Sequence, residues 1–233
     1  MSNVKITQEG PVTVLTVDRA PANALDIETL DEICAAAREL AAGTPRPVVL
    51  HGPGKCFSAG LDLKAIPGYS MAERGRLVDG VNDMVTSLYG LPMPVLAAVS
   101  GHAIAGGLVL ALTADLRVGS ASANYGMTEI QVAVPFPKSA IGLLKAELHD
   151  TASRRLTMIG DLLPAEEALR LGALDEVVPA EQVLPRTLEH AERLAGLSME
   201  VYALTKSELR AAKLANLFAV ATDDPLSAGF EVP

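Results

Sequence analysis

The chain has 233 residues, and its 28 Asp and Glu against 19 Lys and Arg give a net charge of −9 at pH 7. Hydrophobic residues make up 49% of the sequence, which excludes a disordered chain and is enough for the core of one domain. The acidic balance excludes nucleic acid as a main partner, because phosphate binding requires clustered Lys and Arg.

Three features of the sequence bear on the cell compartment. Cys34 and Cys56 form no disulfide framework and no metal cluster, which fits the reducing cytoplasm. The N-terminus lacks the basic start and apolar run of a signal peptide. The longest apolar stretch, residues 95–112, is interrupted by polar residues and glycines and is too short to span a membrane. We therefore expect a cytoplasmic protein with no membrane partner.

The first part of the chain alternates strand and helix patterns. Residues 4–17 show the apolar alternation of a β-hairpin. Asp26 is a candidate N-cap for a helix with apolar residues at helical spacing, which Gly43 ends. Residues 47–50 form a continuous apolar run typical of a buried strand. A glycine-rich loop, residues 52–60, follows this strand.

The same pattern then repeats. One apolar face predicts a helix that ends at Gly90, and residues 95–99 predict a second buried strand. A second glycine loop, residues 101–107, leads into a short helix, and residues 116–118 are a third strand candidate. From residue 139 onward the pattern is almost entirely helical, over residues 164–171, 181–194 and 199–218. Strands alternating with helices predict an α/β core with a parallel sheet.

Both glycine loops follow predicted buried strands, which is where ligands bind in α/β proteins. In the second loop Gly106 stands at a predicted helix start, where free N–H groups favour an anion. Two such donors aimed at one point would form an oxyanion hole. Each loop taken alone is better explained as a tight turn, and neither matches a nucleotide-binding fingerprint.

Several motifs, in the right order, resemble the enoyl-CoA hydratase/isomerase (crotonase) family. Residues 57–63, F-S-A-G-L-D-L, are similar to the family's characteristic first-loop segment. Residues 18–25 resemble its early Arg-Pro…Asn-Ala-Leu turn. Residues 94–103 and 114–117 resemble its second loop and the strand that follows, and residues 165–178 resemble its A…A…G-L-V-D-x-V stretch.

The resemblance implies an α/β fold with a crotonase-like ββα superhelix core over residues 1–190 and a C-terminal helical trimerisation region over residues 191–233. Relatives continue into a basic helix that helps to cover CoA, so we expect this region to be shorter than theirs. Relatives form trimers or dimers of trimers, and the same assembly is expected here. Candidate phosphate contacts on the last helix, with solubility as the alternative role, are Lys206, Arg210 and Lys213.

For the chemistry, the resemblance implies that an acyl-CoA thioester binds and forms an enolate. Two backbone N–H groups, those of Leu61 and Gly106, would hold the enolate oxygen. Coenzyme A is part of this substrate, and no separate cofactor is expected. The expected CoA-binding residues are Ala59, Gly60, Asp62 and Leu63.

Glu129 is the candidate proton-transfer residue. Hydratases of the family resemble one another in having two glutamates. The first lies three residues after the oxyanion glycine, which here is Val109, and the second lies twenty positions later, at Glu129. One carboxylate is therefore missing, and Pro137 occupies an acidic position used by dienoyl-CoA isomerases. A solvated loop glutamate is the alternative interpretation of Glu129.

This difference has a chemical consequence. Hydration needs one group to activate water and another to handle the α-proton. Moving a double bond from the 3,4 to the 2,3 position needs only one proton moved from C2 to C4, which a single carboxylate can do. Relatives with one glutamate and an apolar residue at the Val109 position resemble Δ3,Δ2-enoyl-CoA isomerases. The alternatives are hydration, thioester hydrolysis, C–C cleavage, or an acyl-CoA-binding protein that has lost catalysis.

Residues 134–138, V-P-F-P-K, replace the family's Pro-Gly-x-Gly-Gly segment and are expected to reshape the acyl pocket. The acidic side chains at 73, 79 and 83 are candidate substitutes for the missing glutamate, although solvated helix charge explains them better. The histidines have no ligand spacing, so no metal is expected. The residues expected to line the acyl pocket are Val109, Met127, Pro135 and Phe136.

Overall fold

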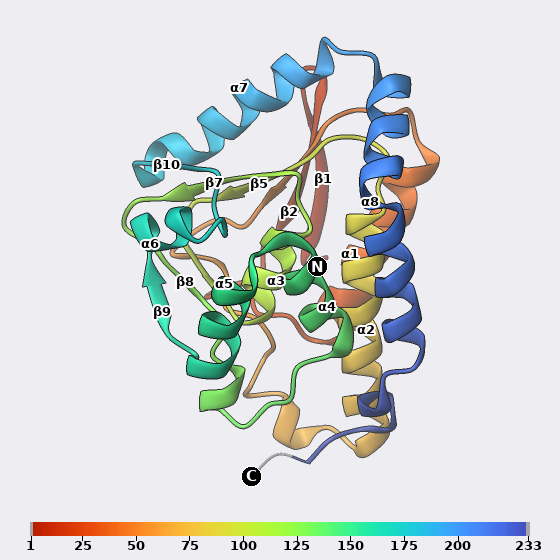
Figure 1. Ribbon diagram of the computed structural model, residues 1–233, viewed down its shortest axis with the longest axis vertical. Helices are drawn as coiled ribbons and strands as arrows, with labels where there is room; N and C mark the ends of the chain where they lie inside the picture. The colour runs from red at the N-terminus through yellow and green to blue at the C-terminus, as the bar shows by residue number, and fades with distance from the viewer. Residues whose placement is uncertain (1, 232–233) are drawn as a thin grey trace.

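Two β-sheets and eight α-helices are present in residues 2–231, which the computed structural model describes (Figure 1). The six-stranded sheet has the order β1 (Val4–Glu9), β2 (Val12–Val17), β3 (Val48–His51), β5 (Val95–Val99), β7 (Leu116–Ser120) and β10 (Glu176–Val178). The four-stranded sheet has the order β4 (Cys56–Ser58), β6 (His102–Ile104), β8 (Asn124–Gly126) and β9 (Leu162–Pro164). The helices are α1 (Ile27–Ala42), α2 (Met71–Tyr89), α3 (Gly106–Leu112), α4 (Lys138–Glu147), α5 (Asp150–Arg154), α6 (Ala165–Arg170), α7 (Val183–Ala195) and α8 (Met199–Thr222).

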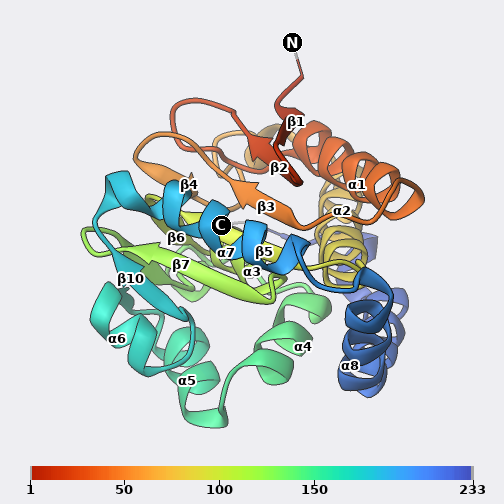
Figure 2. The same ribbon diagram turned by 90° about the horizontal axis from the view of Figure 1, so that it is seen from above.

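Most of the large sheet follows the predicted pattern. The β1–β2 hairpin is antiparallel, and β2, β3, β5, β7 and β10 are parallel to one another. Alternate residues of the strands pack into two separate apolar clusters, and the smaller cluster lies under α7. Figure 2 shows α7 crossing this face of the sheet, while α1 and α2 lie together at one side. Burial on both faces explains the continuous apolar runs of β3 and β5.

The small sheet is the main departure from the predicted elements. Both predicted glycine loops contain a short strand, β4 in the first and β6 in the second. The prediction that nearly everything after residue 139 is helical is wrong at β9 and β10. Each of these strands has three residues, which is too short for an alternating pattern to distinguish it from a loop.

The predicted helix boundaries are set by local capping. The Asp26 side chain accepts a hydrogen bond from the Thr29 N–H at 2.8 Å and begins α1, as predicted. Ser70 and Glu73 form a reciprocal capping box at the start of α2. Gly90 ends α2, as predicted. Glu73, a candidate substitute base, is thus engaged in helix capping.

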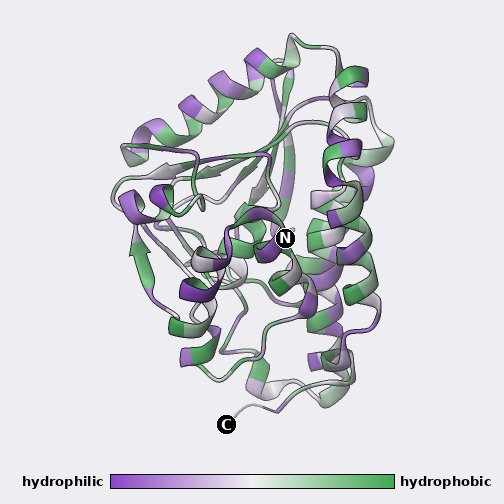
Figure 3. Cartoon of the chain, viewed as in Figure 1, coloured by the Kyte–Doolittle hydropathy of each residue, from purple (hydrophilic) through white to green (hydrophobic). Residues whose placement is uncertain are grey.

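Helix α8 packs against α2 and α4, and buried charges attach it to the core. Figure 3 shows hydrophobic and hydrophilic residues alternating along this helix. Lys206 and Arg210 are 7% and 6% exposed, and both form ion pairs with Asp115. The Arg210 guanidinium also lies 3.7 Å from the centre of the Tyr89 ring. The predicted roles of these two residues, phosphate contact or solubility, are therefore wrong, because neither faces solvent. No helix within residues 2–231 is both long enough and apolar enough to cross a membrane.

Candidate active site

The three predicted site segments follow the carboxyl ends of three neighbouring strands. In the small sheet β4 pairs with β6 and β6 pairs with β8, all parallel. Residues 59–61, 105–106 and 127–129 therefore leave adjacent strand ends at one edge of that sheet. Ligand sites of α/β proteins lie at this edge, because the loops there are free to face a ligand.

The two glycine loops touch at Gly60 and Gly106. Gly60 has φ +78°, and a Cβ added to it would lie 2.8 Å from the Gly106 nitrogen. A Cβ on Gly106 would in turn lie 3.8 Å from the Leu61 nitrogen. Only glycine at position 60 permits both the left-handed backbone and this approach. The N–H groups of Leu61 and Gly106 are thereby close together.

Neither of these N–H groups donates a hydrogen bond to another group in residues 2–231. Buried N–H groups are ordinarily paired, so two neighbouring free ones are available to a ligand. The residue before Gly106, Ala105, has φ +53° and ψ −127°, and its N–H donates to the Gly126 carbonyl at 2.7 Å. Such strain in a residue other than glycine is typical of binding and catalytic sites. This arrangement can hold a developing oxyanion.

The first loop is held by the segment that resembles the family's early turn. The Leu25 N–H donates to the Gly60 carbonyl at 2.8 Å, and the Asp62 N–H donates to the Leu25 carbonyl at 2.9 Å. The buried Ser58 hydroxyl donates to the Asn23 carbonyl at 2.7 Å. These bonds flank Leu61 on both sides. Asn23 and Ser58 are not among the predicted site residues, although both lie in the motifs that carry the resemblance.

Asn23 itself has φ +52°, and its amide donates to the Pro53 and Cys56 carbonyls at 2.9 and 2.8 Å. Asn adopts a positive φ more readily than most residues other than glycine. Its side-chain amide also supplies hydrogen bonds to loop carbonyls that have no partner in a regular sheet or helix. The side chain at 23 therefore fixes the approach to the first loop.

The predicted CoA-binding residues differ in exposure. Gly60 is buried, Ala59 and Asp62 are half-buried, and Leu63 is 47% exposed. Asp62 accepts from Arg19 at 2.7 Å, and the same guanidinium lies 2.9 Å from Asp26. Burial opposes ionisation of Asp62, but the hydrogen bond and charge of Arg19 outweigh it and lower the pKa. The carboxylate is thus committed to fixing the loop.

Glu129 begins a short 3-10 turn after β8 and is only 7% exposed. Its interpretation as a solvated loop glutamate is therefore wrong. Burial raises its pKa to about 7. The Oε2 atom is buried and has no hydrogen-bond partner among the described residues. Near neutral pH this carboxyl is divided between its ionised and protonated forms, which suits proton transfer in both directions.

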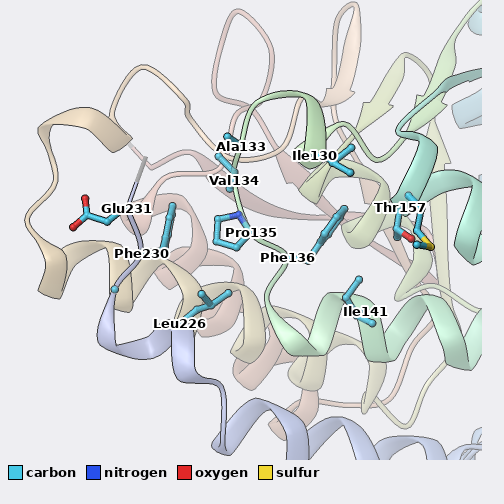
Figure 4. A pocket seen from close by; sticks show the side chains of 12 residues that line it. Ile130, Ala133, Val134, Pro135, Phe136, Ile141, Thr157, Leu226, Phe230 and Glu231 are labelled. Carbon is cyan, nitrogen blue, oxygen red and sulfur yellow. The ribbon is translucent and has the colours of Figure 1, made fainter. Parts of the chain in front are cut away.

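The predicted acyl-pocket residues fall into two groups. Val109 in α3 and Met127 after β8 are 1% and 0% exposed and belong to the apolar core. Pro135 and Phe136 are half-buried and line an apolar cavity of about 830 Å³ (Figure 4). Val109 and Met127 do not line this cavity. A carboxylate at position 109 would be buried among these apolar side chains.

Other titratable groups near the site have structural partners. The Ser227 hydroxyl donates to Asp79 at 2.5 Å, and Asp83 is exposed on α2. His102 Nδ1 accepts from the Asn124 N–H at 2.9 Å, which ties β6 to β8. Burial raises the pKa of the Cys56 thiol, so this cysteine is not an activated nucleophile. Within the described part of the chain, no three His, Cys, Asp or Glu side chains come together as a metal site.

Comparison with known proteins agrees with the family resemblance of the sequence motifs. The family model described as enoyl-CoA hydratase/isomerase matches residues 7–224. A probable enoyl-CoA hydratase of Mycobacterium tuberculosis, EchA17, is 30% identical over 220 residues, which cover 89% of this chain and 84% of that protein. A carnitinyl-CoA dehydratase of Salmonella paratyphi B is 31% identical over 216 residues, covering 90% of this chain and 80% of the relative.

Solved structures share the fold. The probable enoyl-CoA hydratase EchA3 of Mycobacterium tuberculosis matches with a TM-score of 0.89 and 29% identity, covering 94% of this chain and 93% of its own. The human mitochondrial Δ3-Δ2-enoyl-CoA isomerase matches with a TM-score of 0.87 and 28% identity, and the match covers 95% of this chain and 90% of the isomerase chain. These matches confirm the crotonase-like α/β fold. With a family model that spans nearly the whole chain and relatives at 30% identity or above, the chain belongs to the enoyl-CoA hydratase/isomerase family.

Proposed function

We propose that this protein is a Δ3,Δ2-enoyl-CoA isomerase in which Glu129 moves the proton and the Leu61 and Gly106 N–H groups hold the thioester oxygen. The observation that carries the proposal is the single buried carboxyl at this edge of the small sheet. Glu129 has a free Oε2 and a pKa near 7, whereas the first glutamate expected of a hydratase is replaced by the buried Val109.

The proposed reaction has two proton transfers. The Glu129 carboxylate removes a proton from C2 of a 3-enoyl-CoA, and the electron pair delocalises over the thioester and the double bond as a dienolate. The negative oxygen accepts hydrogen bonds from the two N–H groups, a stabilisation for which loss of one donor typically costs about 3 kcal/mol. The Glu129 carboxylic acid then returns its proton to C4. The product is the conjugated 2-enoyl-CoA, and the carboxylate is regenerated.

This reaction transfers no electrons to an acceptor and adds no water. It therefore needs no cofactor beyond the coenzyme A of the substrate, whose binding we assign to Ala59, Gly60, Asp62 and Leu63. We also assign Pro135 and Phe136, which line the apolar cavity, to the walls around the acyl group, whereas the expected Val109 and Met127 belong to the core. We also propose that the protein acts in the cytoplasm, because Cys34 and Cys56 form no disulfide framework.

Hydration is the second candidate, because the EchA17 and EchA3 relatives are named as probable enoyl-CoA hydratases. Glu129 would then have to handle both the water and the α-proton, since Glu73 and Asp79 already have partners within the fold. Asp83 is exposed on α2, and the other buried carboxyl among residues 2–231, that of Asp224, accepts from the Lys138 N–H and the Asn82 amide. Glu129 is therefore the one buried carboxyl in this part of the chain without such partners, which favours isomerisation.

Product identity separates the two candidates. Wild type, Glu129→Gln and the exposed α8 control Glu208→Gln would each be assayed with 3-hexenoyl-CoA and crotonyl-CoA. We expect wild type and Glu208→Gln to convert 3-hexenoyl-CoA to its conjugated isomer. Glu129→Gln should lower kcat by about 10²–10⁴-fold. Hydration of crotonyl-CoA without isomerisation would instead establish the hydratase, and CoA binding without either product would establish a non-catalytic binder.

A further inference from the structure

The apolar cavity of about 830 Å³ shares a wall with the Glu129 segment (Figure 4). Its lining comes from residues 130–136, from α4, from the helical turn 155–159 after α5, and from the C-terminal segment 226–231. The Val134 N–H donates to the Glu129 carbonyl at 3.1 Å, so the wall and the proton-transfer residue belong to one short turn. Only Thr157 and Glu231 contribute polar side chains to the lining.

The C-terminal segment of this lining, residues 226–231, is closely packed against α2. The Arg74 guanidinium donates to the Phe230 carbonyl at 3.0 Å. A Cβ on Gly75 would lie 2.2 Å from the Ser227 carbonyl oxygen, so the two backbones are in direct contact. Segment 226–231 therefore forms a fixed wall.

A buried carboxylate holds the beginning of the same segment. Asp224 is 5% exposed and accepts from the Lys138 N–H at 2.6 Å and from the Asn82 amide at 3.2 Å. It also accepts from the Leu226 N–H at 3.0 Å. These bonds join α2, α4 and segment 226–231. The distance between opposite walls of the cavity is thus set by hydrogen bonds in the protein.

Phe230 is the aromatic side chain that this fixed wall presents. Its side chain is 5% exposed although it lies next to the last described residue, beyond the turn Pro225–Ala228. In Figure 4 the Phe230 ring and Leu226 lie on one side of the cavity, and Phe136 and Ile141 lie on the other. The wall opposite this ring includes residues of the 130–136 segment, which begins one residue after Glu129.

We propose that the cavity takes the aliphatic tail of a medium-chain acyl-CoA and that Phe230 sets the longest chain it accepts. The proposal rests on the proposed function, because the tail reaches the cavity only when the thioester lies beside Glu129. The apolar lining favours an unbranched hydrocarbon over a charged or hydroxylated acyl group, since a polar group buried there would lack partners.

The prediction can be measured as chain-length dependence. Each methylene group that enters an apolar cavity improves the association constant about fourfold. Affinity should rise along the series butanoyl-, hexanoyl-, octanoyl-, decanoyl- and dodecanoyl-CoA, and should stop rising where the tail reaches Phe230. These saturated thioesters have no double bond to move, so calorimetry measures their binding alone.

Two substitutions at one position move the wall in opposite directions. Phe230→Ala should shift the break in the series to chains about two carbons longer. Phe230→Trp should shift it to shorter chains. Both leave the Arg74 bond intact, because that bond is to the main chain. The matched control is Phe218→Ala on α8, which is 52% exposed and does not line the cavity, and it should leave the break unchanged.

Failure of this proposal is distinguishable from failure of the isomerase assignment. A wild type that binds all five thioesters equally, or a break that neither Phe230 variant moves, overturns the role of Phe230 whatever the reaction. A break that moves as expected in a protein that does not isomerise 3-hexenoyl-CoA overturns the isomerase assignment and leaves the cavity assignment standing. No binding of any thioester overturns both.

Discussion

At the scale of single residues, the burial of Glu129 controls when the protein can act. Its pKa is raised from 4.5 to about 7, and the proposed reaction starts from the carboxylate. The kcat/KM for 3-hexenoyl-CoA should therefore rise with pH and level off above an apparent pKa of about 7. A rate profile measured between about pH 5 and pH 9 tests this expectation, and a flat profile would contradict proton removal by Glu129.

The same burial predicts an effect on stability. Below pH 4.5 the carboxyl is protonated in both folded and unfolded chains, so it contributes no pH dependence there. Between 4.5 and about 7 the unfolded chain has released the proton while the folded chain keeps it, so the free energy of unfolding falls as pH rises. The loss reaches roughly 3 kcal/mol above that range.

Glu129→Gln removes this titration. The variant should therefore be more stable than wild type at about pH 8, with a smaller difference at about pH 5. Urea unfolding at the two pH values measures the change, and Glu208→Gln is the exposed control. If wild type and Glu129→Gln differ in their free energy of unfolding by the same amount at both pH values, the pKa of the Glu129 carboxyl is not raised in the folded protein.

Gly60 carries a second prediction at this scale. In Gly60→Ala the new methyl group would lie 2.8 Å from the Gly106 nitrogen, on a backbone with φ +78°. We expect a loss of about 1–3 kcal/mol of stability from strain. We also expect a fall in kcat of about 10²-fold or more from displacement of the N–H pair. Gly54→Ala is a fitting control, since its φ is also positive but a Cβ there meets no atom within 4 Å. Wild-type turnover in Gly60→Ala would remove this loop from the oxyanion site.

At the scale of elements, α8 is attached to the core by one carboxylate shared between two cations. Asp115 lies 2.8 Å from Lys206 and 2.9 Å from Arg210, and it also accepts from the Val95 N–H at 2.7 Å. Burial lowers the pKa of Lys206 to about 8, and Asp115 works against that shift. Each buried charge of Asp115, Lys206 and Arg210 is therefore compensated only while the other charges are present.

Asp115→Asn should therefore be strongly destabilising, by about 3–5 kcal/mol, because it leaves two buried cations without a counter-charge. The exposed pair Lys5–Asp18 gives the comparison, since its side chains are 57% and 43% exposed. Asp18→Asn should cost no more than about 1 kcal/mol. Chemical denaturation of both variants measures the contrast, and similar losses would mean that α8 is held by apolar packing alone.

Elements also differ in how well the sequence predicts them. The helices α1 and α2 have long apolar faces, capping side chains at their starts and glycines at their ends, so local signals agree. The strands β4, β6 and β8 have three residues each, and their hydrogen-bond partners lie more than twenty residues away in the chain. The sequence pattern within a three-residue strand does not depend on partners so far away, so the small sheet could not be predicted from it.

At the scale of the whole molecule, we expect a homotrimer or a dimer of trimers. Apolar side chains on α8 remain exposed in the single chain, among them Leu204 at 62% and Leu209 at 74%. Light scattering should give a mass three or six times 24.3 kDa. Leu209→Glu should lower that mass if α8 contributes to the contact, with Glu208→Gln as the control. A wild-type mass of one chain would contradict the expectation.

The sequence by itself determined the family, the order of most elements and the residues that the proposal uses. This was possible because capping residues, buried strand runs and the two glycine loops act over a few neighbouring positions. The departures from the family pattern, at Val109 and residues 134–138, could also be identified directly from the residue types.

Only the tertiary structure decided how those residues interact. It buried Glu129 and so raised its pKa, brought Gly60 against Gly106, turned Lys206 and Arg210 inward to Asp115, and placed Phe230 on the wall of the cavity. Each of these properties depends on groups far apart in the chain. Solvent exclusion and close approach are set by packing, which is why residue types alone do not specify them.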